Sequence, residues 1–132
     1  MGAKRGLGAV GALLFGVAAA SAADHPGKAP FEQYCASCHG VAADGKGPVA
    51  GELKKQPEDL RKLHEEFGTP LAKPRLREVV DGRDMPGAHG TSDMPVWGDK
   101  LLAAVPPGAG NEAFKRGTIF VILDYLETLQ AK

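Results

Sequence analysis

Residues Cys35 to His39 read Cys-Ala-Ser-Cys-His, and the rest of the chain is best understood from them. On a helix, residues three or four positions apart lie on the same side. Cys35 and Cys38 are therefore placed to bond to one common group, and His39 follows near that same side. A single helical turn thus presents two thiols and one imidazole together.

This spacing is typical of c-type haem attachment. Each thiol can form a thioether with one of the two vinyl groups of a porphyrin, and the imidazole can bind the iron as its proximal ligand. We therefore expect one haem c, attached covalently through Cys35 and Cys38, with its iron bound by His39.

The cysteine pair has three other possible interpretations. A thioredoxin-like redox pair needs a βαβ setting, and a structural zinc site needs a second pair of ligands. The chain has only two Cys and no convincing alternating strands. A plain disulfide is the third alternative, and it stays open at this point.

Composition limits the class of protein. The chain has 132 residues, with 16 Lys plus Arg against 16 Asp plus Glu and 43% hydrophobic residues. This length is typical of one domain. The equal numbers of basic and acidic residues and the hydrophobic content argue against a disordered polyelectrolyte and a basic nucleic-acid binder. Aromatic residues make up only 6%, while there are 18 Gly and 10 Pro, so few large side chains are available to fill a core.

The N-terminal segment has the three-part pattern of a secretory signal peptide. Lys4 and Arg5 precede an uncharged, partly apolar stretch that ends in small residues. We expect residues 1–23 to be this signal, cleaved near Ala22 or Ala23, and residues 24–132 to form one periplasmic domain. A retained membrane anchor is the alternative, although four Gly interrupt the apolar run.

Apolar residues recur at helical spacing along the rest of the chain, and Gly or Pro mark the ends of each segment. The pattern predicts an all-α domain. The expected helices cover residues 29–38, 57–67, 74–81 and 112–130, with a weak helical turn over 49–55.

The long irregular segment at 83–110 is expected to lie against something functional. It contains Met85 and Met94, each followed by Pro. A Met sulfur is a soft ligand that commonly fills the sixth position of a haem iron. His89 and an open sixth position are the alternatives to a Met ligand.

The chain resembles the class I c-type cytochromes over nearly all of residues 24–132. The resemblance is carried by a helix running into the residues 35–39, a Gly-Pro pair at 47–48, a late Met-Pro segment and a long apolar C-terminal helix. It implies a cytochrome c fold, in which four to five short helices wrap around one haem and the first and last helices cross.

The resemblance also implies roles for single residues. Residues 93–98 read Asp-Met-Pro-Val-Trp-Gly, similar to the Met-Pro-x-Trp-Gly form of the distal loop, which makes Met94 the second axial ligand. Pro48 resembles the proline whose carbonyl accepts the other N–H of the proximal His. Trp97 either walls the haem pocket or donates its indole N–H to a propionate.

Two further groups of residues follow from the same resemblance. Gly27 and Phe31 resemble the small and aromatic residues of the first helix that contact the last helix. Ile122 and Tyr125 resemble their partners on the last helix. Two arginines can pair with haem propionates or simply face solvent. They are Arg75 and Arg83.

The implied function is one-electron transfer, with no catalytic residue and no small-molecule substrate. Partners would be redox proteins that bind transiently, in the bacterial periplasm or at the membrane surface. The basic pairs at 54–55 and 61–62 can steer an acidic partner or form solvated helix faces. The alternatives are a haem subunit of a larger dehydrogenase or oxidase, and a haem peroxidase or ligand sensor with a displaceable sixth ligand.

Overall fold

A computed structural model describes residues 24–83, 100–101, 103, 108 and 110–131. Over these residues the chain forms helices and no strands, which confirms the all-α class. No helix in these ranges is long and apolar enough to cross a membrane. The elements in chain order are α1 (Lys28–Tyr34), α2 (Ala36–His39), η2 (Ala50–Glu52), η3 (Leu60–Lys62), α3 (Leu63–Phe67), α4 (Lys73–Val80) and α6 (Asn111–Thr128), where η marks a 3₁₀ turn.

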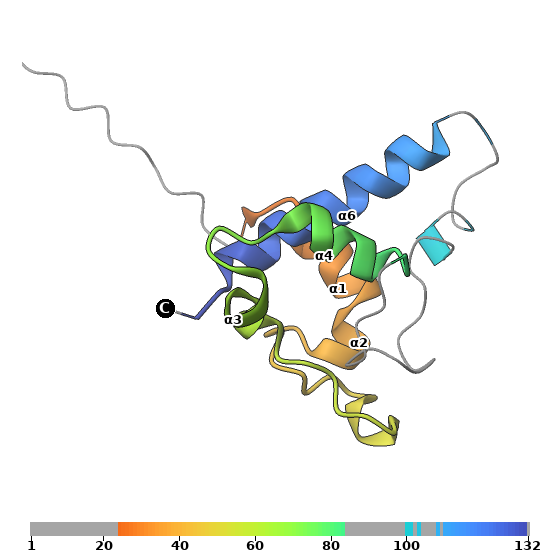
Figure 1. Cartoon of the computed structure of the whole chain (residues 1–132). Helices are drawn as coiled ribbons and strands as arrows, with labels where there is room; N and C mark the ends of the chain where they lie inside the picture. Colours follow the sequence, from red (N-terminus) through yellow and green to blue (C-terminus); the bar gives the residue numbers. More distant parts are fainter. Residues whose placement is uncertain (1–23, 84–99, 102, 104–107, 109, 132) are drawn as a thin grey trace, which may run out of the picture.

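Helices α1 and α4 both lie against the long helix α6 (Figure 1). A single helix was expected over 29–38. The structure instead divides it at Cys35, where φ is −117°, into α1 and α2. The Cys35 carbonyl accepts the backbone N–H groups of Cys38 and His39 at 3.2 and 3.0 Å. Gly40, with φ of 78°, then ends α2 in a conformation that favours glycine. The attachment motif therefore lies on a short turn of its own.

Helix α1 crosses α6 at very close range. A Cβ atom on Gly27 would lie 2.0 Å from the Val121 carbonyl oxygen and 2.7 Å from the Cβ of Tyr125, so only glycine fits there. Next to it, the fully buried ring of Phe31 lies 5.5 Å from the ring of Tyr125, centroid to centroid. The expected contact between the first and last helices is confirmed. Ile122, also expected there, is buried and lines the cavity described below.

The helix expected over 57–67 begins later, at Leu60. Asp59 accepts the backbone N–H of Arg61 at 3.1 Å and also pairs with the Arg61 guanidinium at 2.7 Å, which fixes the start of η3. At the other end of the chain, the amide of Gln130 donates to the Leu60 carbonyl at 2.8 Å. The C-terminal end of the chain is thereby tied to the η3 turn, beside α3 (Figure 1).

Ion pairs join both ends of α4 to α6. At the start of α4, Lys73 Nζ lies 2.6 Å from a carboxylate oxygen of Asp124 and also contacts Glu127. Just after its last residue, Asp81 pairs with Lys115 at 3.3 Å. These contacts hold α4 along α6 and so fix one wall of the cavity between them.

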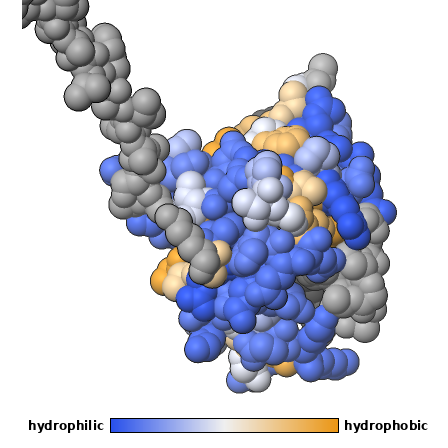
Figure 2. Space-filling model, turned by 60° about the vertical axis from the view of Figure 1, so that its left-hand side comes forward, coloured by the Kyte–Doolittle hydropathy of each residue, from blue (hydrophilic) through white to orange (hydrophobic). Residues whose placement is uncertain are grey.

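Hydrophilic residues cover most of the described surface in the view of Figure 2, with smaller hydrophobic areas between them. The two basic pairs noted in the sequence are partly neutralised by neighbouring acids. Lys55 lies 3.7 Å from Glu58, and Arg61 is bonded to Asp59. The local charge at both places is therefore smaller than the run of basic residues suggests.

Candidate functional site

A cavity lies between the helices and is lined almost wholly by aliphatic and aromatic side chains. It encloses about 730 Å³ of empty space, including the part open to solvent. The lining residues come from every α-helix described and are Tyr34, Cys35, His39, Leu60, Leu63, Phe67, Leu76, Val79, Val80, Leu101, Ile119, Ile122, Leu123 and Leu126.

His39 is a buried polar residue on this cavity wall, with 8% of its surface exposed. Its Nδ1 atom lies 2.9 Å from the backbone carbonyl oxygen of Glu58. Because a carbonyl only accepts hydrogen bonds, Nδ1 carries the proton in this pair. The lone pair of the neutral ring is then on Nε2, the form in which histidine binds a metal.

The backbone of the loop at 45–49 holds the motif turn in place. Its N–H groups at Gly45, Gly47 and Val49 donate to the carbonyls of the three motif residues 39, 38 and 37, at 2.8, 3.0 and 3.1 Å. A Cβ on Gly47 would lie only 2.3 Å from the Ser37 carbonyl oxygen, so the two backbones touch. These bonds use the carbonyls that a short helix otherwise leaves without partners.

Cys35 and Cys38 are both free thiols, so the pair is not a disulfide in this structure. Both are half-buried, and Cys35 lies on the cavity wall. Burial raises the pKa of Cys35 to about 12, and the neighbouring Cys38 adds to this shift. Reactive redox cysteines have the opposite shift, toward a lower pKa. The environment of Cys35 therefore does not resemble that of a thioredoxin-like pair.

The structure differs from the expectation for Pro48. The resemblance assigned its carbonyl to the proximal histidine, whereas the carbonyl that accepts from His39 Nδ1 belongs to Glu58. Pro48 is exposed and is not among the cavity-lining residues. Its position after Gly47 in a turn agrees with the plainer interpretation of the Gly-Pro pair, namely a turn that brings Gly47 against the motif.

The remaining predicted site residues have two different outcomes. Met94 and Trp97, and also Met85 and His89, lie outside the described residues. The two arginines considered for propionates lie elsewhere than on the cavity wall. Arg75 is exposed, with its guanidinium 5.4 Å from the ring centroid of Phe67, and Arg83 pairs with Asp81.

The residues present fit a covalently bound haem. The wall is apolar, as a porphyrin face requires, and it carries one thiol of the motif and the buried imidazole of His39. Within the described ranges no group of three His, Cys, Asp or Glu side chains could hold a bare metal ion.

Comparison of the chain with protein-family models, with curated proteins and with solved structures finds no match. The interpretation of the site thus depends on its own residues and geometry.

Sequence reasoning missed the Glu58 carbonyl as a functional group. A backbone carbonyl carries no residue-type signal, and its contact with His39 spans 19 positions. The sequence holds only an indirect indication of this contact. Glycines at 45 and 47 have no side chain and so allow the loop to lie against the motif.

Proposed function

We propose that this chain is an electron-transfer protein, a c-type cytochrome that carries one covalently bound haem. Cys35 and Cys38 would hold the porphyrin through thioethers, and His39 would bind its iron. Met94 would supply the second axial ligand. The observation that carries the proposal is the apolar cavity, which both Cys35 and the buried His39 line.

When bound, the haem supplies one-electron chemistry, the exchange between ferric and ferrous iron. The chain's own residues prepare the site for it. The Glu58 carbonyl keeps the proton of His39 on Nδ1, which orients the ring and strengthens Nε2 as a donor. Leucine, isoleucine and valine side chains of α4 and α6 give the cavity an apolar lining.

The proposal needs no acid or base catalyst, so the chain itself is proposed as a carrier and not as an enzyme. Export by the segment at 1–23 would place it in the bacterial periplasm or at the membrane surface. Its partners would be redox proteins that bind transiently to pass the electron, and no substrate would enter the iron coordination sphere.

The test of this function is export of the full chain in a bacterium that matures c-type cytochromes. Mass spectrometry of the unfolded product should show the chain with one haem still attached. The matched variant Cys35→Ala/Cys38→Ala, expressed in the same way, should give only the bare chain. A wild-type product without bound haem contradicts the proposal.

A second measurement separates the carrier from the peroxidase or sensor. The ferric protein should be low-spin, because both axial positions are occupied, and it should not turn over peroxide. A high-spin ferric spectrum with peroxide turnover would instead identify an open sixth position. Co-purification with a larger dehydrogenase or oxidase would identify a subunit with the same chemistry.

A further inference from the structure

Gly45 contacts both His39 and the segment at 57–58, whose Glu58 carbonyl accepts the hydrogen bond from the His39 ring. The backbone N–H of Gly45 donates to the His39 carbonyl at 2.8 Å. On its other side, a Cβ atom on Gly45 would lie 2.4 Å from the Pro57 carbonyl oxygen and 3.3 Å from the Glu58 carbonyl oxygen. The bare Cα of Gly45 is thus packed against the peptide that precedes Glu58.

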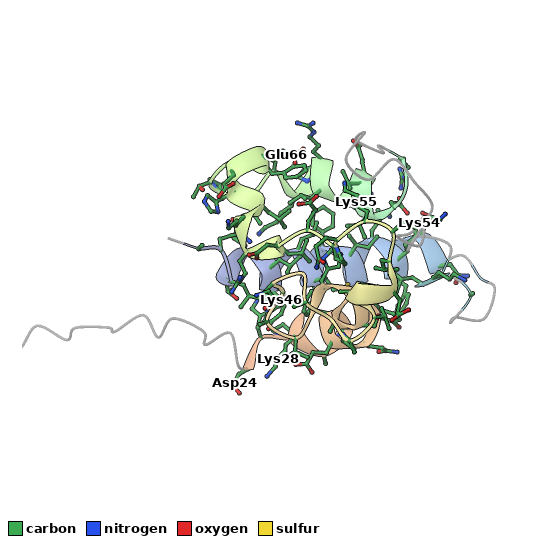
Figure 3. All side chains as sticks on the ribbon, turned by 90° about the horizontal axis from the view of Figure 1, so that it is seen from below. Asp24, Lys28, Lys46, Lys54, Lys55 and Glu66 are labelled. Carbon is green, nitrogen blue, oxygen red and sulfur yellow. The ribbon has the colours of Figure 1, made fainter. Side chains whose placement is uncertain are left out.

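Two further hydrogen bonds flank this contact. The side-chain amide of Gln56 donates to the Gly45 carbonyl, and the backbone N–H of Leu60 donates to the Ala43 carbonyl at 2.8 Å. Residues 56–60 are therefore tied to residues 43–45 on both sides of Glu58. Figure 3 views the molecule from the side of this loop, where the labelled Lys46, Lys54 and Lys55 lie.

The Glu58 side chain has no part in this arrangement. It is about half exposed and lies 3.7 Å from Lys55. The hydrogen bond to the histidine ring is made by the Glu58 carbonyl oxygen, so the position of this oxygen is set by the backbone and not by the identity of residue 58.

We infer that Gly45 is a positioning residue for the proximal histidine, because its missing side chain sets the distance between the Glu58 carbonyl and His39 Nδ1. This inference rests on the proposed function and adds a way in which the chain tunes its iron ligand. A carbonyl at 2.9 Å draws the Nδ1 proton and makes Nε2 a stronger donor. A stronger donor favours ferric over ferrous iron, so a longer bond favours the ferrous state.

The test is Gly45→Ala in the full, haem-loaded chain. The added methyl group must push the Pro57 peptide away, and the Glu58 carbonyl moves with it. We expect the equilibrium constant for reduction to rise by about two- to tenfold, the effect of weakening one hydrogen bond. We also expect the His39 Nδ1 proton, followed by NMR, to exchange faster with solvent.

Gly68→Ala is the matched control. Gly68 has φ of 80°, close to the 77° of Gly45, so both variants place alanine at a similar positive φ. A Cβ on Gly68 would lie 3.9 Å from its nearest neighbour, the Pro70 carbonyl oxygen, and would displace nothing. This variant should leave both the reduction equilibrium and the Nδ1 exchange rate as in the wild type.

Gln56→Ala tests the same peptide without a steric clash and serves if Gly45→Ala does not fold. It should shift both readouts in the same direction by a smaller factor. The inference is overturned if Gly45→Ala, or Gln56→Ala in its place, matches Gly68→Ala in both readouts. If the wild type carries no haem, the proposed function fails, and the Nδ1 exchange rate alone still decides whether Gly45 positions Glu58.

Discussion

Lys115 on α6 and Asp81 at the end of α4 form an ion pair that is almost closed to solvent. The Lys115 Nζ atom lies 3.3 Å from Asp81 Oδ1, and the two side chains are 10% and 3% exposed. Burial by itself raises the pKa of Asp81, but hydrogen bonds from Arg83 and Lys115 outweigh it and lower that pKa below its ordinary value. The pair therefore stays charged at neutral pH and joins the end of α4 to α6.

Lys115→Met is expected to destabilise the fold by about 1–3 kcal/mol, because it leaves the Asp81 carboxylate buried with fewer partners. Arg83, which also bonds Asp81, keeps the loss below that of an isolated buried charge. Urea unfolding of wild type and Lys115→Met at pH 7 measures this loss as the difference in free energy of unfolding. The control is Lys28→Met, whose exposed partner Glu32 lies 3.9 Å away, with an expected change within about 0.5 kcal/mol. Equal losses in the two variants contradict this account of the pair.

Acid should weaken the start of η3. Hydrogen bonds from Arg61 to its side chain lower the pKa of Asp59 from 3.8 to about 2. A carboxyl group whose pKa is lower in the folded state stabilises the fold above its unfolded pKa, and the contribution disappears as pH falls through the folded pKa. The stability difference between wild type and Asp59→Asn should therefore shrink between about pH 4 and pH 2. Unfolding curves over this range measure it, and a difference that does not change with pH would refute it.

Gly27→Ala should loosen the crossing of α1 and α6, since the new Cβ would overlap the Val121 carbonyl and the Tyr125 side chain. We expect a loss of about 1–3 kcal/mol, as for other overpacked sites. Gly117→Ala, in the middle of α6 with nothing within 4 Å of its added Cβ, should instead gain about 0.5–1 kcal/mol. Thermal unfolding of both variants checks the two signs, and a neutral Gly27→Ala would show that the helices can separate without cost.

Much of the helical pattern follows from single residues. Gly40, Gly68 and Gly82 have φ of 78°, 80° and 75°, and each stands at the end of a helix, as the sequence predicts. Pro74 lies in the first turn of α4, where its missing N–H costs nothing. These features could be predicted because a side chain, or its absence, restricts the backbone locally.

The structure differs from the sequence prediction where contacts between distant parts of the chain determine the backbone path. Pro57 and the acids after it favour a helix start, but the segment at 56–60 is bonded to the loop at 43–45, and the helical turn begins only at Leu60. The partner of His39 is missed for the same reason, since the Glu58 carbonyl reaches the ring only through the folded loop. Local preference predicts ends of helices, whereas the loop path depends on tertiary contacts.

The axial ligand remains a prediction from the sequence, because Met94 and Met85 lie outside the described residues. A Met sulfur bound to ferric haem gives a far-red charge-transfer absorption band. We expect Met94→Ala to lose this band and Met85→Ala to keep it. The opposite result would assign the ligand to Met85, and a wild-type protein without the band would exclude both.

Covalent haem attachment is tested most directly by the alkaline pyridine spectrum of the exported wild-type chain. Haem joined by thioethers to Cys35 and Cys38 should give the spectrum of a porphyrin whose vinyl groups have been saturated. The pigment should also stay with the polypeptide in acidified organic solvent. A colourless chain, or a pigment that the solvent extracts, contradicts covalent haem attachment and with it the proposed function.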